Sequence, residues 1–135
     1  MALQLSVAVR NSRLDAIETA VGLTPIMKIF TGSMPASCAT ADSGSVLATL
    51  TLPSDWMAAA ASGSKSKSGT WQDSSADSTG TAGYFRIYDS AGTTCHLQGT
   101  VTLTAGGGDM TVDNTSFASG QSFTVNTFTL TDANA

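Results

Sequence analysis

The chain has 135 residues, a length typical of one domain, and its 6 Lys and Arg against 10 Asp and Glu give a net charge of −4. Its basic residues are few and scattered, which argues against nucleic-acid binding, because neutralising phosphates requires clustered Lys and Arg. Only 12% of the residues are charged and there is a single His, whereas Ala, Gly, Ser and Thr make up more than half of the chain. Catalysis and metal binding need clustered titratable groups, so the composition favours a structural protein over an enzyme.

No segment approaches the roughly 20 apolar residues that a membrane span requires, and the N-terminus lacks the pattern of a secretion signal. We therefore expect no membrane association and a protein made in the cytoplasm. Cys38 and Cys95 lie far apart, without the spacing of metal ligands. A cytoplasmic origin favours buried free thiols, with a disulfide as the alternative.

The first 24 residues predict an N-terminal helix or arm. Apolar positions recur at spacings of three and four residues, together with one arginine, in a stripe formed by Leu3, Val7, Arg10, Leu14, Ile17 and Val21. Ser12 and Asp15 offer N-terminal capping chemistry, and Gly22 and Pro25 follow where a helix should end. We expect the stripe to pack on this protein's own sheet, with an intersubunit seam as the alternative.

The beginning of this segment also has a strand-like pattern. Leu5, Val7 and Val9 alternate with polar or small residues, so residues 3–10 fit either the helix or an arm that pairs with the sheet of another chain.

Residues 25–135 are predicted to be β-rich. Alternation of apolar and polar side chains indicates strands over 26–30, 46–52, 84–88, 97–103, 110–112 and 121–131, the last with a bulge near Asn126. A loop is expected over 31–42, a short helical turn after Ser54, and a long surface loop or edge strand over 61–82. The alternation of apolar and polar residues over 97–103 predicts that one face of its sheet is wet, that is, exposed to solvent.

Six or seven short strands after one helix favour a mainly β, single-domain, jelly-roll-like β-sandwich over 25–135.

The residues indicate no catalytic, cofactor-binding or metal site. His96 is the only candidate base, and its neighbour Cys95 would point to the opposite strand face. The pairs Asp73 with Asp77 and Asp109 with Asp113 match no calcium-loop motif, so we interpret them as turn formers.

Trp71 is the one large apolar group in the polar stretch 61–82. We favour a role in anchoring that segment to the sheet, with an exposed ring for ligand contact as the alternative.

Five segments spread over most of the chain resemble the cement, or decoration, proteins of tailed-bacteriophage capsids, of the type carried by a short-tailed phage of Bordetella: Leu14–Ala20, Leu47–Trp56, Gly69–Asp73, Phe85–Asp89 and Gly108–Asn114. The resemblance implies an all-β, jelly-roll-like virion protein that binds the exterior of the expanded shell, bridges subunits of the major capsid protein and carries no catalytic residues. Repeated copies on a symmetric lattice would add up to a strong clamp.

The resemblance also implies which partners the chain binds. We expect the major capsid protein and further copies of this chain, as a homodimer or a trimer, through candidate contacts at Leu3, Val7, Leu14, Ile17 and Trp71. The alternative function is a ligand-binding or glycan-binding β module of a phage fibre or appendage.

Overall fold

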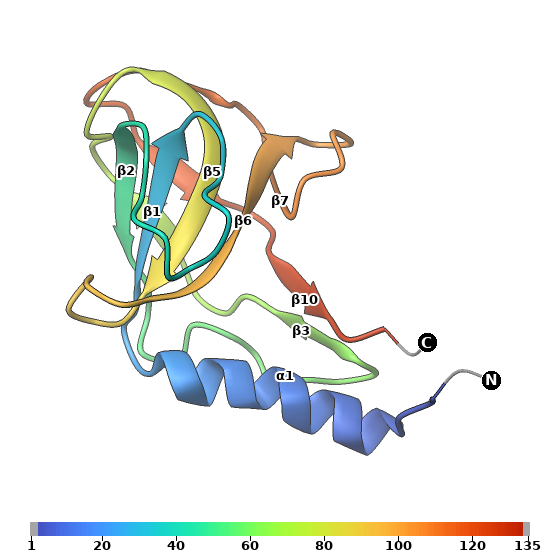
Figure 1. Cartoon of the computed structure of the whole chain (residues 1–135). Helices are drawn as coiled ribbons and strands as arrows, with labels where there is room; N and C mark the ends of the chain where they lie inside the picture. Colours follow the sequence, from blue (N-terminus) through green and yellow to red (C-terminus); the bar gives the residue numbers. More distant parts are fainter. Residues whose placement is uncertain (1–2, 134–135) are drawn as a thin grey trace.

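A 15-residue helix, α1 (Val7–Val21), begins the fold, and ten strands follow it in the computed structural model, which describes residues 3–133 (Figure 1). The ends of the two predicted segments, residues 1–2 and 134–135, lie outside the described residues. The described chain forms a mainly β single domain with one N-terminal helix.

Helix α1 begins nearly two turns earlier than its predicted capping residues suggest. Ser6 is the N-cap, and its Oγ accepts from the Val9 N–H at 3.2 Å; Ser12 and Asp15, the predicted capping residues, lie inside the helix. The helix ends at Gly22, as predicted, where φ is +92° and glycine avoids the strain that a side chain would cause. The ambiguous segment 3–10 is therefore helical from Val7, not a strand.

The main sheet has the strand order β2-β1-β5-β6-β7, with β8 (Ser116–Phe117) pairing with the start of β5. The strands are β1 (Ile26–Thr31), β2 (Val46–Thr51), β5 (Gly80–Tyr88), β6 (Cys95–Leu103) and β7 (Met110–Val112). The pair β6-β7 is parallel and the other pairs are antiparallel, so the sheet is mixed, and it does not close on itself.

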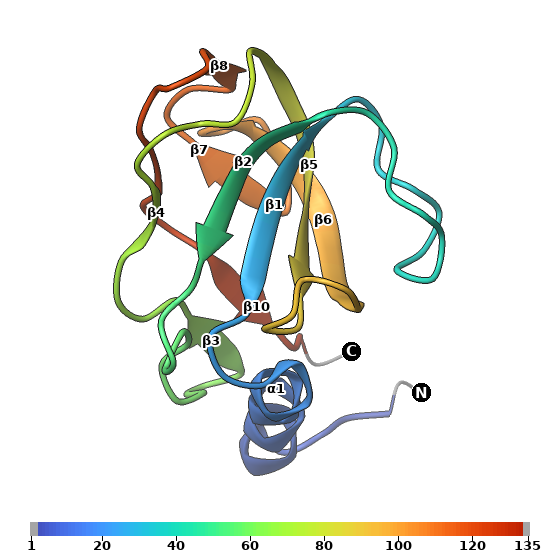
Figure 2. The same cartoon turned by 90° about the vertical axis from the view of Figure 1, so that its left-hand side faces the viewer.

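Two smaller two-stranded sheets complete the domain. One joins β3 (Ser64–Ser66) to β10 (Thr129–Thr131), and the other joins β4 (Trp71–Asp73) to β9 (Phe123–Val125). Figure 1 shows α1 crossing below β3 and β10, at one end of the main sheet. Figure 2, turned by 90°, shows the same helix nearly end-on beneath the strands.

The core lies between the inner face of the main sheet and the segments around β4 and β9. Met27, Ile29 and Ile87 come from the sheet and are fully buried in one cluster with Trp56 and Trp71. Aromatic rings join the two sides: the Trp71 ring lies 5.2 Å from the Phe128 ring, which meets the Phe85 ring edge-on at 5.5 Å. Such offset and edge-on pairs add to the free energy gained by burying the rings.

The outer face of the main sheet is only partly wet, in contrast to the prediction of a wet face: Phe30, Tyr84 and Arg86 are buried there, whereas Thr100 and Thr102 are half-exposed. The loop 32–45, here called the strap loop, lies over this face and is visible in Figure 2 as the long loop between β1 and β2. Tyr84 donates to the Ser43 carbonyl at 2.6 Å, and Phe30 stacks on Tyr84 at 4.8 Å. The loop starts close to Gly83, where an added Cβ would collide with the Gly32 backbone.

Three local predictions are wrong because the segments involved pair with distant strands. Residues 61–82 contain β3, β4 and the first residues of β5 instead of one loop or one edge strand. Residues 121–131 form two strands in different sheets, so there is a break at 126–128 and no bulge. No helical turn follows Ser54; Met57 instead forms an isolated bridge with Lys67. The described chain has ten strands, more than the six or seven expected.

Candidate functional site

An apolar surface is exposed at the start of the described chain. Leu3 is 80% exposed, and Val7 and Val9, in the first turn of α1, are 47% and 46% exposed. We call these three residues the N-terminal apolar surface. A shallow, mostly apolar groove of about 380 Å³ adjoins it, lined by Ala8, Val9, Ser12, Arg13 and Ala16. Three exposed apolar side chains within seven residues make this end of the chain a candidate interaction surface.

The rest of α1, from Arg10 onward, is packed on the domain along the predicted stripe. Leu14 and Val21 are buried, and Ile17 is half-buried against the core. Arg10 donates to the Asp132 carbonyl at 3.1 Å, which ties the helix to the C-terminal segment. The stripe therefore packs on this protein's own domain from Arg10 onward, while its first two members, Leu3 and Val7, remain exposed.

A buried ammonium group fastens the middle of the helix. Lys65, on β3, is only 2% exposed, and its Nζ lies 2.7 Å from Asp15 Oδ1 and 2.7 Å from Glu18 Oε2. Its third hydrogen bond, at 2.9 Å, goes to the Ala58 carbonyl. All three donors of the ammonium are thus used, which is the condition under which a buried charge is tolerated.

This arrangement shifts two pKa values. The hydrogen bond from Lys65, followed by that from the Ala60 N–H, lowers the pKa of Asp15. Burial alone would lower the pKa of Lys65, but hydrogen bonds to Asp15 and Glu18 outweigh it and raise that pKa. Both shifts favour the charged pair, so the helix is held most firmly when both groups are ionised.

The predicted contact residues therefore separate into two groups. Leu3 and Val7 are exposed, whereas Leu14 and Trp71 are buried inside this chain and Ile17 is largely covered. Trp71 is fully buried and donates from Nε1 to the Ser68 carbonyl at 3.1 Å, which confirms the anchoring interpretation and excludes the exposed ring. Val9, interpreted only as a possible strand position, joins the exposed group.

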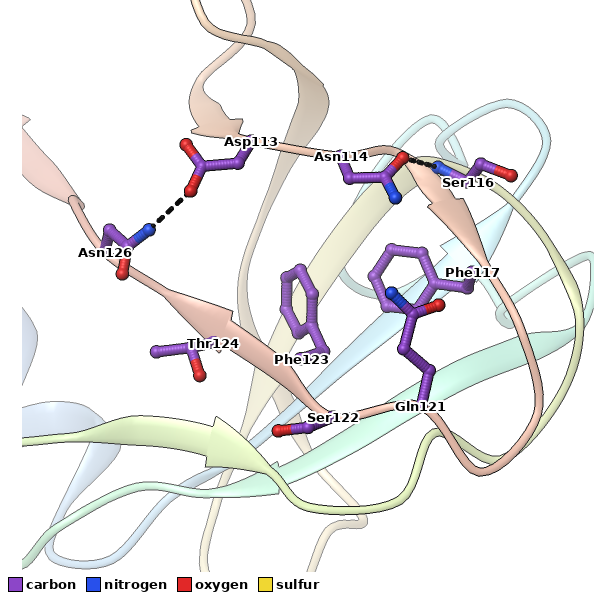
Figure 3. Close-up of a pocket in the computed structure, with 9 residues that line it drawn as sticks. All are labelled: Asp113, Asn114, Ser116, Phe117, Gln121, Ser122, Phe123, Thr124 and Asn126. Atoms are coloured by element: carbon purple, nitrogen blue, oxygen red, sulfur yellow. Dashed lines mark hydrogen bonds between the residues drawn. The ribbon is translucent and has the colours of Figure 1, made fainter.

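A second candidate site is a pocket of about 230 Å³ near β8 and β9 (Figure 3). The Phe117 and Phe123 rings lie at its centre, 4.5 Å apart, and are largely buried. Polar side chains surround them. In Figure 3 the Asp113 carboxylate and the Asn126 amide face each other at one end, joined by a 2.9 Å hydrogen bond.

The opposite end of this pocket carries amides. Asn114 Oδ1 accepts from the Ser116 N–H at 2.9 Å, and Gln121 Oε1 accepts from the Ala118 N–H at 3.0 Å. Each amide thus uses its oxygen on the backbone and presents its NH₂ group as a donor. Apolar rings framed by amides and a carboxylate provide the contacts that polyhydroxylated ligands use. This site could not be recognised in the sequence, because its residues come together only through the β8-β9 turn.

The remaining candidate residues have structural roles. Asp109 Oδ2 accepts from the Thr100 N–H at 2.8 Å, and Asp73 Oδ2 accepts from the Thr49 N–H at 2.9 Å, so both carboxylates stabilise backbone turns and strand ends. His96 is exposed on β6. Within residues 3–133 no three His, Cys, Asp or Glu side chains gather in a way that could hold a metal ion. The helix found in that range is too short and too polar to span a lipid bilayer.

In comparisons with known proteins, no family model matches this chain, and neither curated proteins nor solved structures gave a match.

Proposed function

We propose that this chain is a virion structural protein: a capsid cement protein that binds the outer surface of an icosahedral shell and bridges subunits of the major capsid protein. The observation that carries the proposal is the N-terminal apolar surface, which this chain leaves uncovered while the rest of the helix, from Arg10 onward, is packed and ion-paired. The resemblance of the sequence to decoration proteins supplies the identity of the partner.

A rigid support makes this surface suited to clamping. The ion pairs of Lys65 and the hydrogen bond from Arg10 fix the helix on the domain, so little conformational entropy is lost when its exposed end docks. Each contact is small, but many copies on a symmetric shell act together. The helix end would dock on one capsid subunit, while the β domain or a second copy of the chain contacts the next.

The proposal extends to the fold, the oligomeric state and the location of the chain. The β domain has a jelly-roll-like arrangement, the chain acts as a homodimer or trimer, and it works on the capsid exterior after synthesis in the cytoplasm of the bacterial host. It acts without catalysis and binds neither nucleic acid nor membrane. The net charge of −4 agrees with a protein that does not bind the phosphates of nucleic acids.

Single substitutions test the docking surface. In Val7→Asp the new carboxylate lies in the first turn of α1, where the helix dipole favours negative charge, so folding is retained while the apolar contact is lost. The matched control is Leu103→Asp, which changes an equally exposed apolar residue at the end of β6. We expect V7D to lose co-sedimentation with capsid shells and L103D to keep it. Equal binding by both variants would refute this docking surface.

A second candidate function is favoured by the pocket of Figure 3. Its two phenylalanine rings, amide donors and Asp113 carboxylate suit a saccharide, as in a glycan-binding module of a phage fibre or appendage. Asn126→Ala would remove the partner of Asp113 without touching the rings. Glycan binding that N126A weakens, combined with no shell binding by the unmodified chain, would replace the cement proposal with this one.

A further inference from the structure

Two cysteines that are distant in the chain meet on the outer face of the main sheet. Cys38 belongs to the strap loop and Cys95 is the first residue of β6, and both are half-buried free thiols. They line one cavity of about 290 Å³, together with Arg86 and Tyr88. Cys38 lies close enough to the Cys95 thiol to help raise its pKa.

The backbone on both sides of this contact is fixed. Arg86 Nη2 donates to the Ser37 carbonyl at 3.1 Å and to the Thr40 carbonyl at 2.8 Å, so the strap loop is held on either side of Cys38. Cys95 lies opposite Tyr88 in the β5-β6 pairing. The folded chain therefore holds the two thiols together, and the entropy cost of closing a long loop is already met by folding.

We propose that Cys38 and Cys95 form an intramolecular disulfide when the folded protein meets a low-molecular-weight disulfide such as oxidised glutathione. The Cys38 thiolate attacks one sulfur of the oxidant, forms a mixed disulfide and releases one reduced glutathione. The Cys95 thiolate then attacks Cys38 Sγ and releases the second. The protein loses two electrons and two protons, and the oxidant takes them up as two thiols.

The environment of Cys95 sets the order of these steps. Burial first, and then the neighbouring Cys38 side chain, raise the pKa of the Cys95 thiol to about 12. Its thiolate is therefore scarce at neutral pH, and Cys95 is a poor first nucleophile. Once Cys38 is in the mixed disulfide, its thiol no longer stabilises the protonated form of Cys95, and the second sulfur is already adjacent.

The cross-link would act on the strap loop. It would add a covalent bond to the hydrogen bonds from Arg86 and Tyr84 that hold this loop on the sheet. A reducing cytoplasm keeps both thiols free, and an oxidising medium closes the bond. The inference does not depend on the capsid role, because all of its contacts lie within one chain.

The test treats the full chain with oxidised glutathione at neutral pH and records intact mass, free thiols and thermal unfolding. We expect a monomer lighter by about 2 Da that resists alkylation. Its Tm should rise by roughly 10 °C and return to the starting value after reduction. In Cys95→Ser the reaction should stop at one glutathione adduct on Cys38.

A matched control moves the thiol by one position, with Ser37→Cys and Cys38→Ser combined. This variant keeps two cysteines but moves the loop thiol to position 37, whose side chain bonds Thr40 and does not line the cavity, and we expect glutathione adducts in place of the cross-link. Two adducts on the unmodified chain, unreacted thiols, or disulfide-linked dimers would each overturn the proposal. An equally rapid cross-link in the shifted variant would also overturn it, because closure would then not depend on the native position.

Discussion

Replacing Lys65 with methionine should release helix α1 from the β domain. The Lys65 ammonium makes three hydrogen bonds, to Asp15 at 2.7 Å, to Glu18 at 2.7 Å and to the Ala58 carbonyl at 2.9 Å. Methionine keeps the length and apolar character of the lysine stem, so the substitution removes the charge while largely preserving the packing. Two carboxylates then face each other without their cation.

The size of the effect follows from this geometry. Removing one partner from a buried ionic cluster costs about 3–5 kcal/mol when the remaining charges stay buried. The Asp15 and Glu18 side chains are 49% and 24% exposed, so water partly replaces the ammonium. For Lys65→Met we therefore expect a loss near the lower limit, about 3 kcal/mol in the free energy of unfolding. This corresponds to a fall in Tm of roughly 10 °C for a domain of this size.

Thermal unfolding followed by circular dichroism measures the global effect, and hydrogen exchange of the α1 amides measures local release of the helix. A detached helix of 15 residues is marginal in water, so its amides should lose protection before those of β1 and β5. The control is Lys67→Met, in which a half-buried lysine away from α1 loses a 2.7 Å bond to the Gly69 carbonyl and the approach of its Nζ to the Trp71 ring at 5.7 Å. The reasoning is refuted if K65M and K67M have the same Tm and the same protection of α1.

Three further predictions concern the helix anchor and the strap loop. The lowered pKa of Asp15 means that its carboxylate stabilises the docked helix at pH values above its ordinary pKa, and this stabilisation is lost as pH falls through the folded-state pKa, below about pH 4. The raised pKa of Lys65 means that its ammonium contributes fully below about pH 10, and this contribution is lost as pH rises further. Exchange protection of the α1 amides should therefore fall at both extremes of pH, and a flat profile would contradict the anchor. Gly83→Ala should lower the free energy of unfolding by about 3 kcal/mol, because its Cβ meets the backbone of Gly32; a melt unchanged within 1 °C would show that the strap loop does not pass there. Arg86→Met should cost about 3 kcal/mol and speed proteolysis within the strap loop, since the buried guanidinium satisfies two loop carbonyls; unchanged cleavage would argue against this role.

Sequence reasoning performed best where the signal was local. The helix stripe from Arg10 to Val21, its end at Gly22, and the hairpin of β5 and β6 follow from periodicity and turn chemistry, and the structure has them all. These features depend on residues within a few positions of one another, so a single sequence contains the information needed to recognise them.

Features that depend on distant partners were not predictable in this way. Residues 64–66 and 71–73 have no strand pattern of their own, and they become β3 and β4 only because the C-terminal segments β10 and β9 pair with them. The outer sheet face was predicted to be solvent-exposed because Thr and Gln alternate along β6; Thr100 and Thr102 are half-exposed, but the strap loop covers the part of that face around Arg86 and Tyr84.

The candidate site shows the same division. Exposure of Leu3 and Val7 could be proposed from the sequence, but the sequence could not show which part of the stripe the domain would cover. Lys65 stands in a polar stretch that looked like a surface loop, and only the packed structure shows that it is the buried anchor of the helix. A single lysine carries no sequence signal that separates the two situations.

The most direct test of the proposed function is co-sedimentation of the purified chain with expanded shells assembled from the major capsid protein encoded with it, together with the thermal stability of those shells. The account predicts saturable binding at a fixed ratio to the capsid protein and a more stable shell, both lost in V7D and both kept in L103D. Absence of binding by the unmodified chain, with shells shown to be expanded, would contradict the cement proposal and direct attention to glycan binding at the pocket of Figure 3.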